Sequence, residues 1–249
     1  QPGIVSRIPF PIDDLKSISS RIIEQAKIAG ETLIQLVAME EEARIFVAPE
    51  FANGRGLEEC LREKAALSEN VERSLQNIDM LVESALDLEK DAKAFIEEAI
   101  ASFDDVEKGA VLTDRSKPTA IVKLLSWCIG VIFGRWDVRM AIDPSLAPKL
   151  PDPFDPLPVC PPGMLVGPDG LPAKPAGIVS EAWLRARPDA NTLPPDGSVS
   201  KPTIPDSEYP LRINWDGILV DDPGFNGNQP HRDDIVRRVR EVFDLLWKD

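Results

Sequence analysis

The chain has 249 residues, a formal net charge of −14 and three cysteines. This length is enough to bury a hydrophobic core in one large domain or two small ones. The acidic balance repels phosphate backbones, which excludes a surface that grips nucleic acid as a whole and leaves only local DNA contacts. No uncharged apolar run approaches the roughly 18 residues of a membrane span, so we expect no membrane contact.

The cysteines and the first residues of the chain indicate where in the cell the protein is located and whether it is processed. Cys60, Cys128 and Cys160 are odd in number, lie far apart and form no CxxC pair, which disfavours a disulfide framework and a zinc site. We therefore expect a reducing, cytoplasmic location. Residues 1–3 lack the basic and apolar regions of a signal peptide and an initiator Met, so we expect a fragment or a processed chain.

Two long helices are predicted in the first half. Apolar residues recur at steps of three and four from Leu15 to about Val47, with Gly30 as a weak point. A second helical stretch runs from about Leu57 to Phe103, and we expect a break near Leu67-Ser68. Beyond that break the apolar spacing is a heptad-like stripe that pairs with another helix. The residues expected to bind a partner are Val71, Leu75, Ile78 and Val82.

A third helix is predicted to start at Lys117-Pro118, because a proline in the first helical turn loses no hydrogen bond. It is apolar on nearly all sides through Phe133, which indicates a central position in a bundle. Gly130 and Gly134 would let a neighbouring backbone approach it closely.

The composition changes at Asp143, since 19 of the 24 prolines lie between Pro144 and Pro230. Such a segment is either disordered or an extended strap laid over the helices. Residues of the type usually buried favour the strap, and residues 164–171 have the pattern of a small β-hairpin. The residues expected to be buried are Phe154, Leu157, Val159, Met164, Leu165, Trp183, Leu184, Leu211, Ile213, Trp215, Ile218 and Leu219.

Helical spacing returns from Asp233 to Trp247. The predicted fold is therefore mainly α: a helical bundle with a long antiparallel helix pair over residues 1–143, wrapped by a Pro-rich strap with one small hairpin over 144–230. Residues 231–249 form a C-terminal helix that packs on the bundle.

Catalytic patterns are missing from the sequence. There is no HExxH, Walker A, GxGxxG or Gly-x-Ser-x-Gly pattern, and the single histidine, His231, is best interpreted as a loop or cap residue. Asp221-Asp222 and Asp233-Asp234 are either cation ligands or, more commonly for such pairs, turn formers and helix caps. We predict no catalytic, cofactor-binding or metal-binding residue.

Basic residues flank the third and the last helix. If both helices face one side, Arg135, Arg139, Arg237 and Arg238 form a local positive patch that contacts DNA phosphates. The alternative is that these arginines pair with the many carboxylates nearby.

A segment of the third helix resembles a known family. Residues 125–137 read LSWCIGVIFGRWD, which is similar to a stretch that follows the catalytic domain in large bacterial adenine-specific DNA methyltransferases of type IIG restriction-modification and of BREX- and DISARM-type phage defence. The next conserved pattern of that family is a Pro-rich or hydrophobic stretch, an Asp-Asp pair and a helix that begins Asp-Ile-Val. Residues 217–222 (GILVDD) and 233–238 (DDIVRR) resemble this pattern. The order of elements agrees from about residue 12 to the end, whereas close motif matches cover about thirty residues.

The resemblance implies methyl transfer from S-adenosylmethionine to adenine in the parent enzyme, on a base flipped out of the duplex. The family's catalytic tetrapeptide and cofactor loop are not found in this chain: residues 160–163 (CPPG) and 193–196 (LPPD) lack the polar first and aromatic last residue. No catalytic residue is therefore carried over. The resemblance implies a helical connector whose partners are the methyltransferase core, of the same or another chain, and double-stranded DNA.

The sequence and this resemblance leave two main hypotheses of function. In the first, the chain is a non-catalytic scaffold of a restriction or phage-defence methyltransferase that links the core to target recognition. In the second, it is a stand-alone acidic helical adaptor whose stripe from Val71 to Phe103 binds a protein. An enzyme with an unrecognised site is a weaker third hypothesis.

Overall fold

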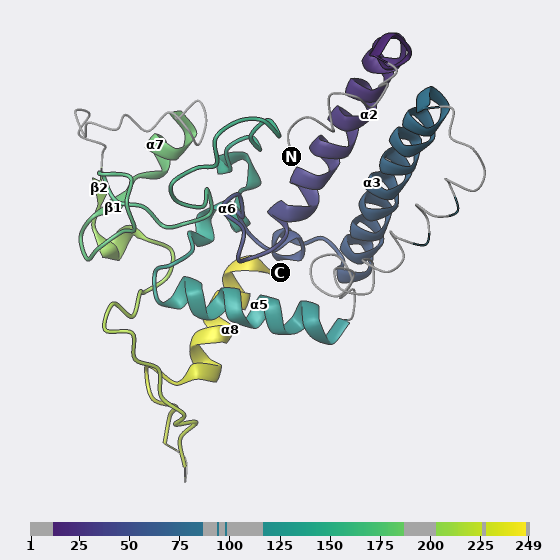
Figure 1. Cartoon of the computed structure of the whole chain (residues 1–249). Coiled ribbons are helices and arrows are strands. Elements are labelled where there is room, and N and C mark those ends of the chain that lie inside the picture. The colour runs from purple at the N-terminus through teal and green to yellow at the C-terminus, as the bar shows by residue number, and fades with distance from the viewer. Residues whose placement is uncertain are drawn as a thin grey trace, which may run out of the picture. The chain divides into compact units, whose positions relative to one another are not determined.

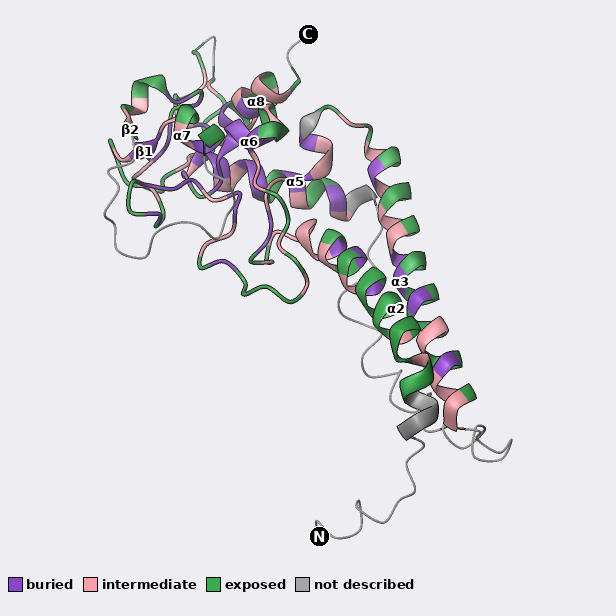
Figure 2. Cartoon of the chain, turned by 90° about the horizontal axis from the view of Figure 1, so that it is seen from above, coloured by how far each residue is buried: buried purple, intermediate pink, exposed green. Residues whose placement is uncertain are grey.

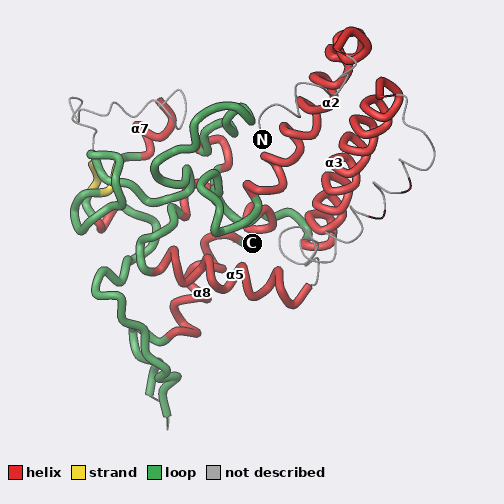
Figure 3. Tube along the Cα trace, in the orientation of Figure 1, coloured by secondary structure: helices red, strands yellow, loops and turns green. Residues whose placement is uncertain are grey.

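The computed structural model describes residues 12–86, 117–186, 203–225 and 228–247, together with the single positions 94 and 98. The fold is mainly helical, as predicted, with a long helix pair and a small two-stranded antiparallel sheet (Figures 1 and 3). Contacts divide the chain into two compact units. Of the long described stretches, the first unit contains residues 12–33 and 64–86, and the second unit contains the rest.

The first unit contains residues 12–33 of α2 (Ile12–Ala38) and residues 64–86 of α3 (Leu57–Leu86), two antiparallel helices that lie side by side in Figures 1 and 2. The Asn77 side-chain amide donates a hydrogen bond of 3.1 Å to Gln25 Oε1 across the pair. The expected break near residues 67–68 is wrong, because α3 is continuous and contains neither glycine nor proline. The predicted extension towards Phe103 lies outside the residues described in detail.

The helix α2 ends earlier than its apolar pattern indicates. It was expected to reach about Val47 but ends at Ala38, after which the chain turns so that Ile45 and Phe46 enter the core of the second unit, each 1% exposed. A short 3₁₀ helix, η1 (Glu50–Asn53), follows, and Gly54 with φ of 84° ends it. Tertiary burial of two side chains therefore sets the end of this helix.

The second unit is built around α5 (Lys117–Ile132), which begins at the predicted proline and contacts α8 (Ile235–Leu246). Between these helices the chain forms short elements and long loops (Figure 3). These are α6 (Val138–Ile142), η2 (Pro144–Leu146), β1 (Ile178–Val179), α7 (Glu181–Ala186), β2 (Thr203–Ile204) and η3 (Asp206–Glu208).

The core of the second unit joins α5 to the Pro-rich segment. Trp127, Cys128, Val131 and Ile132 on α5 are fully buried. They pack in one cluster with buried residues of the Pro-rich segment and of α8, namely Leu165, Ile178, Tyr209, Leu211, Ile213 and Val242. Over its described residues the Pro-rich segment is thus a packed strap and not a disordered linker. The second unit spans the predicted boundary at residue 143, because the strap and α5 share one core.

Several details of the strap differ from the sequence-based expectation. Phe154, Leu157, Val159 and Ile218 were expected to be buried, but they are 82%, 55%, 86% and 56% exposed. The expected hairpin is present as a tight turn, in which Gly167 N donates to Leu171 O at 2.9 Å and Val166 bridges Pro172. The paired strands lie elsewhere, with Ile178 opposite Ile204.

Among the helices that the structure describes, none combines the length and the apolar character needed to cross a membrane.

Candidate functional site

The segment that carries the family resemblance forms the C-terminal cap of α5. Gly134 has φ of 73°, Gly134 N donates to Val131 O at 3.0 Å, and Arg135 N donates to Gly130 O at 2.7 Å. This pair of bonds is a Schellman motif, which satisfies the last carbonyl groups of a helix and requires a residue with positive φ. Gly134 was expected to allow close approach of a backbone, whereas its conformation is what the cap needs.

The glycine one turn earlier makes room for a tryptophan. A Cβ atom on Gly130 would lie 2.4 Å from the Trp136 ring, so only glycine fits beneath the indole. The ring is fully buried, packs edge-on against Phe46 with centroids 4.9 Å apart, and donates from Nε1 to Glu41 at 2.9 Å. The approaching group is thus a side chain and not the predicted backbone.

A buried ion pair follows immediately. Arg139 donates from Nε and Nη2 to the two oxygens of Asp137 at 2.9 and 2.7 Å, and from Nη1 to Val179 O at 2.8 Å. The Tyr209 hydroxyl accepts from Val138 N at 2.9 Å and lies 3.3 Å from Asp137 Oδ1. Burial by itself lowers the pKa of Arg139. The hydrogen bonds to Asp137 and the negative charge of Asp137 outweigh this effect, so the pKa of Arg139 is raised.

This ion pair removes one predicted DNA contact. The Arg139 side chain is 4% exposed and Asp137 is fully buried, so a phosphate cannot reach the guanidinium in this structure. The sequence left two alternatives open for Arg139, a contact with phosphate and an ion pair with a nearby carboxylate, and the structure shows the ion pair. Asp137 caps α6 and lies two residues before Arg139, and this spacing is the feature of the sequence that could have predicted the ion pair.

The arginines of α8 are divided between core and solvent. Arg237 is 45% exposed and its Nε donates to Glu241 at 3.3 Å. Arg238 is 1% exposed, pairs with Glu241 and donates to the Arg212 backbone oxygen. Burial, followed by the charge of Arg212, lowers the pKa of Arg238 to about 10. The prediction of a phosphate contact for Arg238 is therefore wrong, because Arg238 faces the core side of α8.

Arg135 completes the predicted set. It is 57% exposed, stacks 4.6 Å from the centroid of the Trp136 ring and lies 4.0 Å from Glu41. Each of the four arginines thus has a carboxylate neighbour, and two of the four are buried. Arg135 and Arg237 are the members of the set that solvent reaches, so the structure does not assemble the four into one basic patch.

The second acidic pair, Asp233-Asp234, has structural roles. Asp234 caps α8 by accepting from Arg237 N at 2.9 Å and accepts from Asp222 N at 3.0 Å. Asp233 accepts from Arg212 at 2.5 Å and from Asn214 at 3.0 Å. These hydrogen bonds, of which that from Arg212 contributes most, lower the pKa of Asp233 to about 2. No group of three potential metal ligands occurs among the described residues.

His231 lies at the turn before α8. It is 47% exposed on its side chain, and its Nδ1 accepts a hydrogen bond from Asp233 N at 3.1 Å. Since Asp234 is the N-cap of α8, His231 is a loop residue that precedes the cap.

The partner-binding stripe on α3 is partly used within the first unit. Val71 is 6% exposed, Ile78 and Val82 are half-buried, and Leu75 is 50% exposed. Ser74, which does not belong to the predicted stripe, is 5% exposed in place of Leu75. The buried face of α3 is therefore rotated away from the predicted heptad line at this turn, and Leu75 is left on the surface.

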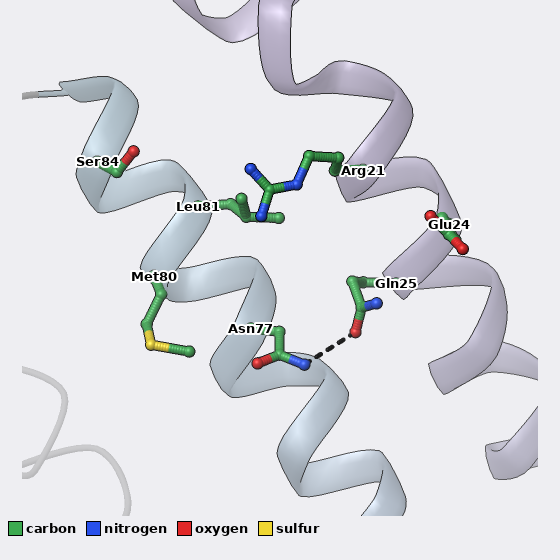
Figure 4. Close-up of a pocket in the computed structure, with 7 residues that line it drawn as sticks. All are labelled: Arg21, Glu24, Gln25, Asn77, Met80, Leu81 and Ser84. Carbon is green, nitrogen blue, oxygen red and sulfur yellow. Dashed lines mark hydrogen bonds between the residues drawn. The ribbon is translucent and has the colours of Figure 1, made fainter.

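A hollow lies between the two helices of the first unit (Figure 4). Its volume is about 490 Å³, and Arg21 points across it towards Leu81, near the bond between Gln25 and Asn77. The lining mixes charged, amide, hydroxyl and apolar groups. It contains neither a histidine nor a cysteine.

An uncovered apolar surface lies on α5. One side of this helix is buried in the core of the second unit, but Ile121, Val122 and Leu125 are 50%, 64% and 38% exposed, so the helix is not buried on all sides as its sequence indicated. We call these three residues the α5 outer face. Beside it is the α5 pocket, a cavity of about 240 Å³. The pocket is lined by Phe51, Arg55, Leu57, Ala120, Ile121, Leu124 and Trp247.

The α5 outer face and the α5 pocket are suited to binding a protein. Uncovered apolar side chains that adjoin an apolar cavity with a single charged lining residue are typical of surfaces where a partner places an anchor. Sequence reasoning missed this surface because a helix that is apolar all round predicts burial on every side. The arrangement offers apolar contact and contains no acid–base pair.

Comparison with protein-family models, with curated proteins and with solved structures found no match to this chain.

Proposed function

We propose that the chain is a non-catalytic scaffold that docks onto a protein partner through the α5 outer face. The observation that carries the proposal is the contrast between the two sides of one helix. Trp127, Cys128 and Val131 are fully buried in the core, whereas Val122 is 64% exposed. A partner that covers the outer face removes this apolar surface from water, which is the main driving force of protein association.

The sequence resemblance supplies the candidate partner. In this proposal the partner is the catalytic core of a bacterial adenine-specific DNA methyltransferase of a restriction or phage-defence system, in the same or another chain. The core binds S-adenosylmethionine and performs the chemistry, and the present chain links the core to target recognition in the cytoplasm. The resembling segment forms the cap and core of the second unit, and this supports a scaffolding role for it.

DNA contact has a narrower place in this proposal than the four predicted arginines suggested. Arg135 and Arg237 are exposed enough to meet a phosphate, whereas Arg139 and Arg238 maintain the core. Each exposed arginine also has a carboxylate neighbour that competes with phosphate. We therefore expect weak, salt-dependent DNA affinity, reduced in Arg135→Gln and in Arg237→Gln.

The test begins with the natural product. An antibody raised against this chain recovers it from its source cell, and its intact mass and S-adenosylmethionine-dependent adenine methylation of DNA are measured. Recovery with a methylating core, on the same or a bound polypeptide, is the expected result. Recovery of a free protein that neither contains nor binds a methyltransferase overturns the assignment.

The docking surface is then tested in that assembly. Val122→Glu places a charge on the outer face and is expected to reduce association with the core, or methylation where both are one chain. The matched control is Ile23→Glu, since Ile23 is 66% exposed on α2 in the other unit. Equal effects of the two substitutions contradict a docking role for α5.

A second candidate is a stand-alone adaptor that binds a protein through the helix pair. The exposure of Leu75 at 50% and of Met80 at 60% favours it, because these apolar residues lie on α3 without cover. In this case Leu75→Glu weakens binding of a partner while Val122→Glu does not. The adaptor has no salt-dependent DNA affinity.

A further inference from the structure

The Pro-rich strap carries the two most exposed large apolar side chains among the residues that the structure describes. These are Val159 and Phe154, which are 86% and 82% exposed, and Leu157 between them is 55% exposed. All three lie within residues 154–159, which read FDPLPV. Apolar side chains gathered on one exposed segment are typical of a surface that another molecule covers.

The prolines of this segment restrict its backbone. A proline fixes its own φ at about −65°, and the residue before a proline is confined to extended conformations. Pro156 and Pro158 therefore constrain all four residues from Asp155 to Pro158. Residues 156–158 lie in no helix, strand or turn. These restrictions favour the polyproline II conformation in this stretch.

The backbone of the same stretch is not used within the chain. In the part of the chain that the structure describes, no N–H or C=O group of residues 156–159 makes a hydrogen bond. A polyproline II segment has no internal hydrogen bonds, so its carbonyl groups are free to accept from a partner. The segment thus offers both apolar side chains and backbone acceptors to another molecule.

The segment is held in place on both sides. At its start a turn is closed by Asp155 N, which donates to Asp152 O at 2.9 Å. Pro158 is buried, and after it Gly163 N donates to Phe46 O at 3.0 Å. A segment that is already fixed loses little conformational entropy when it binds, which is the advantage of preorganisation.

Two carboxylates stand at the start of the segment. Asp152 Oδ1 accepts from Phe154 N at 3.1 Å, and Asp155 Oδ2 accepts from Asp152 N at 3.2 Å. These are bonds to neutral backbone groups, and neither carboxylate forms an ion pair with a described residue. Their negative charge is therefore not balanced by a cation of this chain, and it is complementary to a basic residue of a partner.

We propose that residues 154–159 are a recognition segment that binds, in the polyproline II conformation, to a groove lined by aromatic side chains on a partner protein. Grooves of this kind recognise Pro-rich segments because the conformation is formed before binding. The partner has a basic residue beside the groove, where it meets the carboxylates of Asp152 and Asp155. The segment belongs to the strap and not to α5, so the inference goes beyond the proposed function and does not rest on it.

Photo-crosslinking of the full chain in its source cell identifies the partner. A benzophenone amino acid replaces Phe154 in one variant and Phe225 in the other. Phe225 is the matched position, because it is 73% exposed near Pro223 while its backbone oxygen accepts from Asn228 N at 3.1 Å. We expect a cross-linked protein from position 154 and not from position 225, and we expect the linked peptide to contain tryptophan or tyrosine.

The purified cross-linked protein then serves as the probe in calorimetric titrations of the full chain. Phe154→Ala is expected to weaken binding roughly 10-fold or more, because an aromatic anchor is lost. Pro156→Ala keeps the three apolar side chains but frees the backbone, and a loss of roughly 10-fold is expected. The matched control is Pro223→Ala, an exposed proline of the other loop, which is expected to bind like the unchanged protein. Added salt is expected to weaken binding.

Three results overturn the inference. The first is the absence of a cross-linked protein specific to position 154. The second is a cross-link to another copy of this chain. The third is equal affinity of Pro156→Ala and the unchanged protein, which indicates apolar contact or strand addition without polyproline II recognition. Circular dichroism of each variant excludes unfolding as the cause of weaker binding.

The same variants keep this inference apart from the proposed function. If Val122→Glu abolishes association with a methyltransferase core while Pro156→Ala binds its partner normally, the proposed function stands and this inference fails. If Pro156→Ala weakens binding to the cross-linked protein while Val122→Glu and Ile23→Glu behave alike, the inference stands and the docking role of α5 fails.

Discussion

Replacing Asp137 by asparagine tests the strongest energetic statement of the structure. Arg139 would lose its charged partner while it is 4% exposed, and an amide N–H would replace the oxygen that accepts from Nη2 at 2.7 Å. Breaking a buried ion pair by removing one partner costs about 3–5 kcal/mol, because an uncompensated charge is left in the core. We therefore expect Asp137→Asn to reduce the free energy of unfolding by that amount.

Urea unfolding followed by tryptophan fluorescence measures this change in the relevant unit, because all five tryptophans lie in the second unit. The control is Glu181→Gln, which breaks an ion pair to Arg185 whose side chains are 51% and 52% exposed. Such a solvent-exposed pair contributes little to stability, so this variant is expected to unfold nearly like the unchanged protein. A loss below about 1 kcal/mol for Asp137→Asn would refute the argument that the pair is buried and coupled.

A second substitution separates the lost pair from a generally damaged core. Adding Arg139→Met to Asp137→Asn removes the unpaired charge, so the double variant is expected to be more stable than Asp137→Asn alone. Strictly additive losses from the two single variants would contradict direct coupling between these side chains.

Three further predictions concern other parts of the second unit. Gly163→Ala is expected to destabilise the protein by about 1–3 kcal/mol, because its Cβ meets Val47 O at 1.8 Å, whereas Gly56→Ala, with nothing within 4 Å, has little effect in the same urea assay. The pKa of Asp233 is lowered to about 2 in the folded state, so its stabilisation is present above its unfolded pKa of about 3.9 and is lost as pH falls through about 2. Asp233→Asn is thus expected to lower stability at pH values near 5 and to converge with the unchanged protein below about 2 in acid titrations; a constant difference would be the contrary result. A thiol reagent is expected to modify Cys160 first, by peptide mass, because Cys60 and Cys128 are buried and burial raises the pKa of Cys128 to about 12; equal labelling of all three would show that the core opens readily.

Local signals in the sequence predicted the helices correctly where those signals act within one turn. The start of α5 follows from Pro118, and the start of α8 follows from Asp234, whose side chain caps it. The long pair α2 and α3 follows from apolar residues at steps of three and four. These features depend on neighbours along the chain, and a single sequence contains them.

Side-chain burial was decided by the tertiary structure. Arg237 and Arg238 are adjacent and chemically identical, yet they are 45% and 1% exposed because α8 turns one of them towards the core. On α3, Ser74 is buried and Leu75 is exposed, although the apolar pattern predicts the reverse. A one-residue rotation of a helix face changes which neighbour is buried, and the packing partner sets that rotation.

The sequence by itself determined that this protein is mainly helical and acidic, and it favoured a Pro-rich strap over a disordered linker, because periodicity, caps and composition act locally. Only the tertiary structure decided that two of the four candidate arginines are core residues, that α5 has an uncovered face, and that Phe154 stands in solvent. Burial is a relation between segments distant in the chain, so charge and apolar character do not by themselves say which side chains meet a partner.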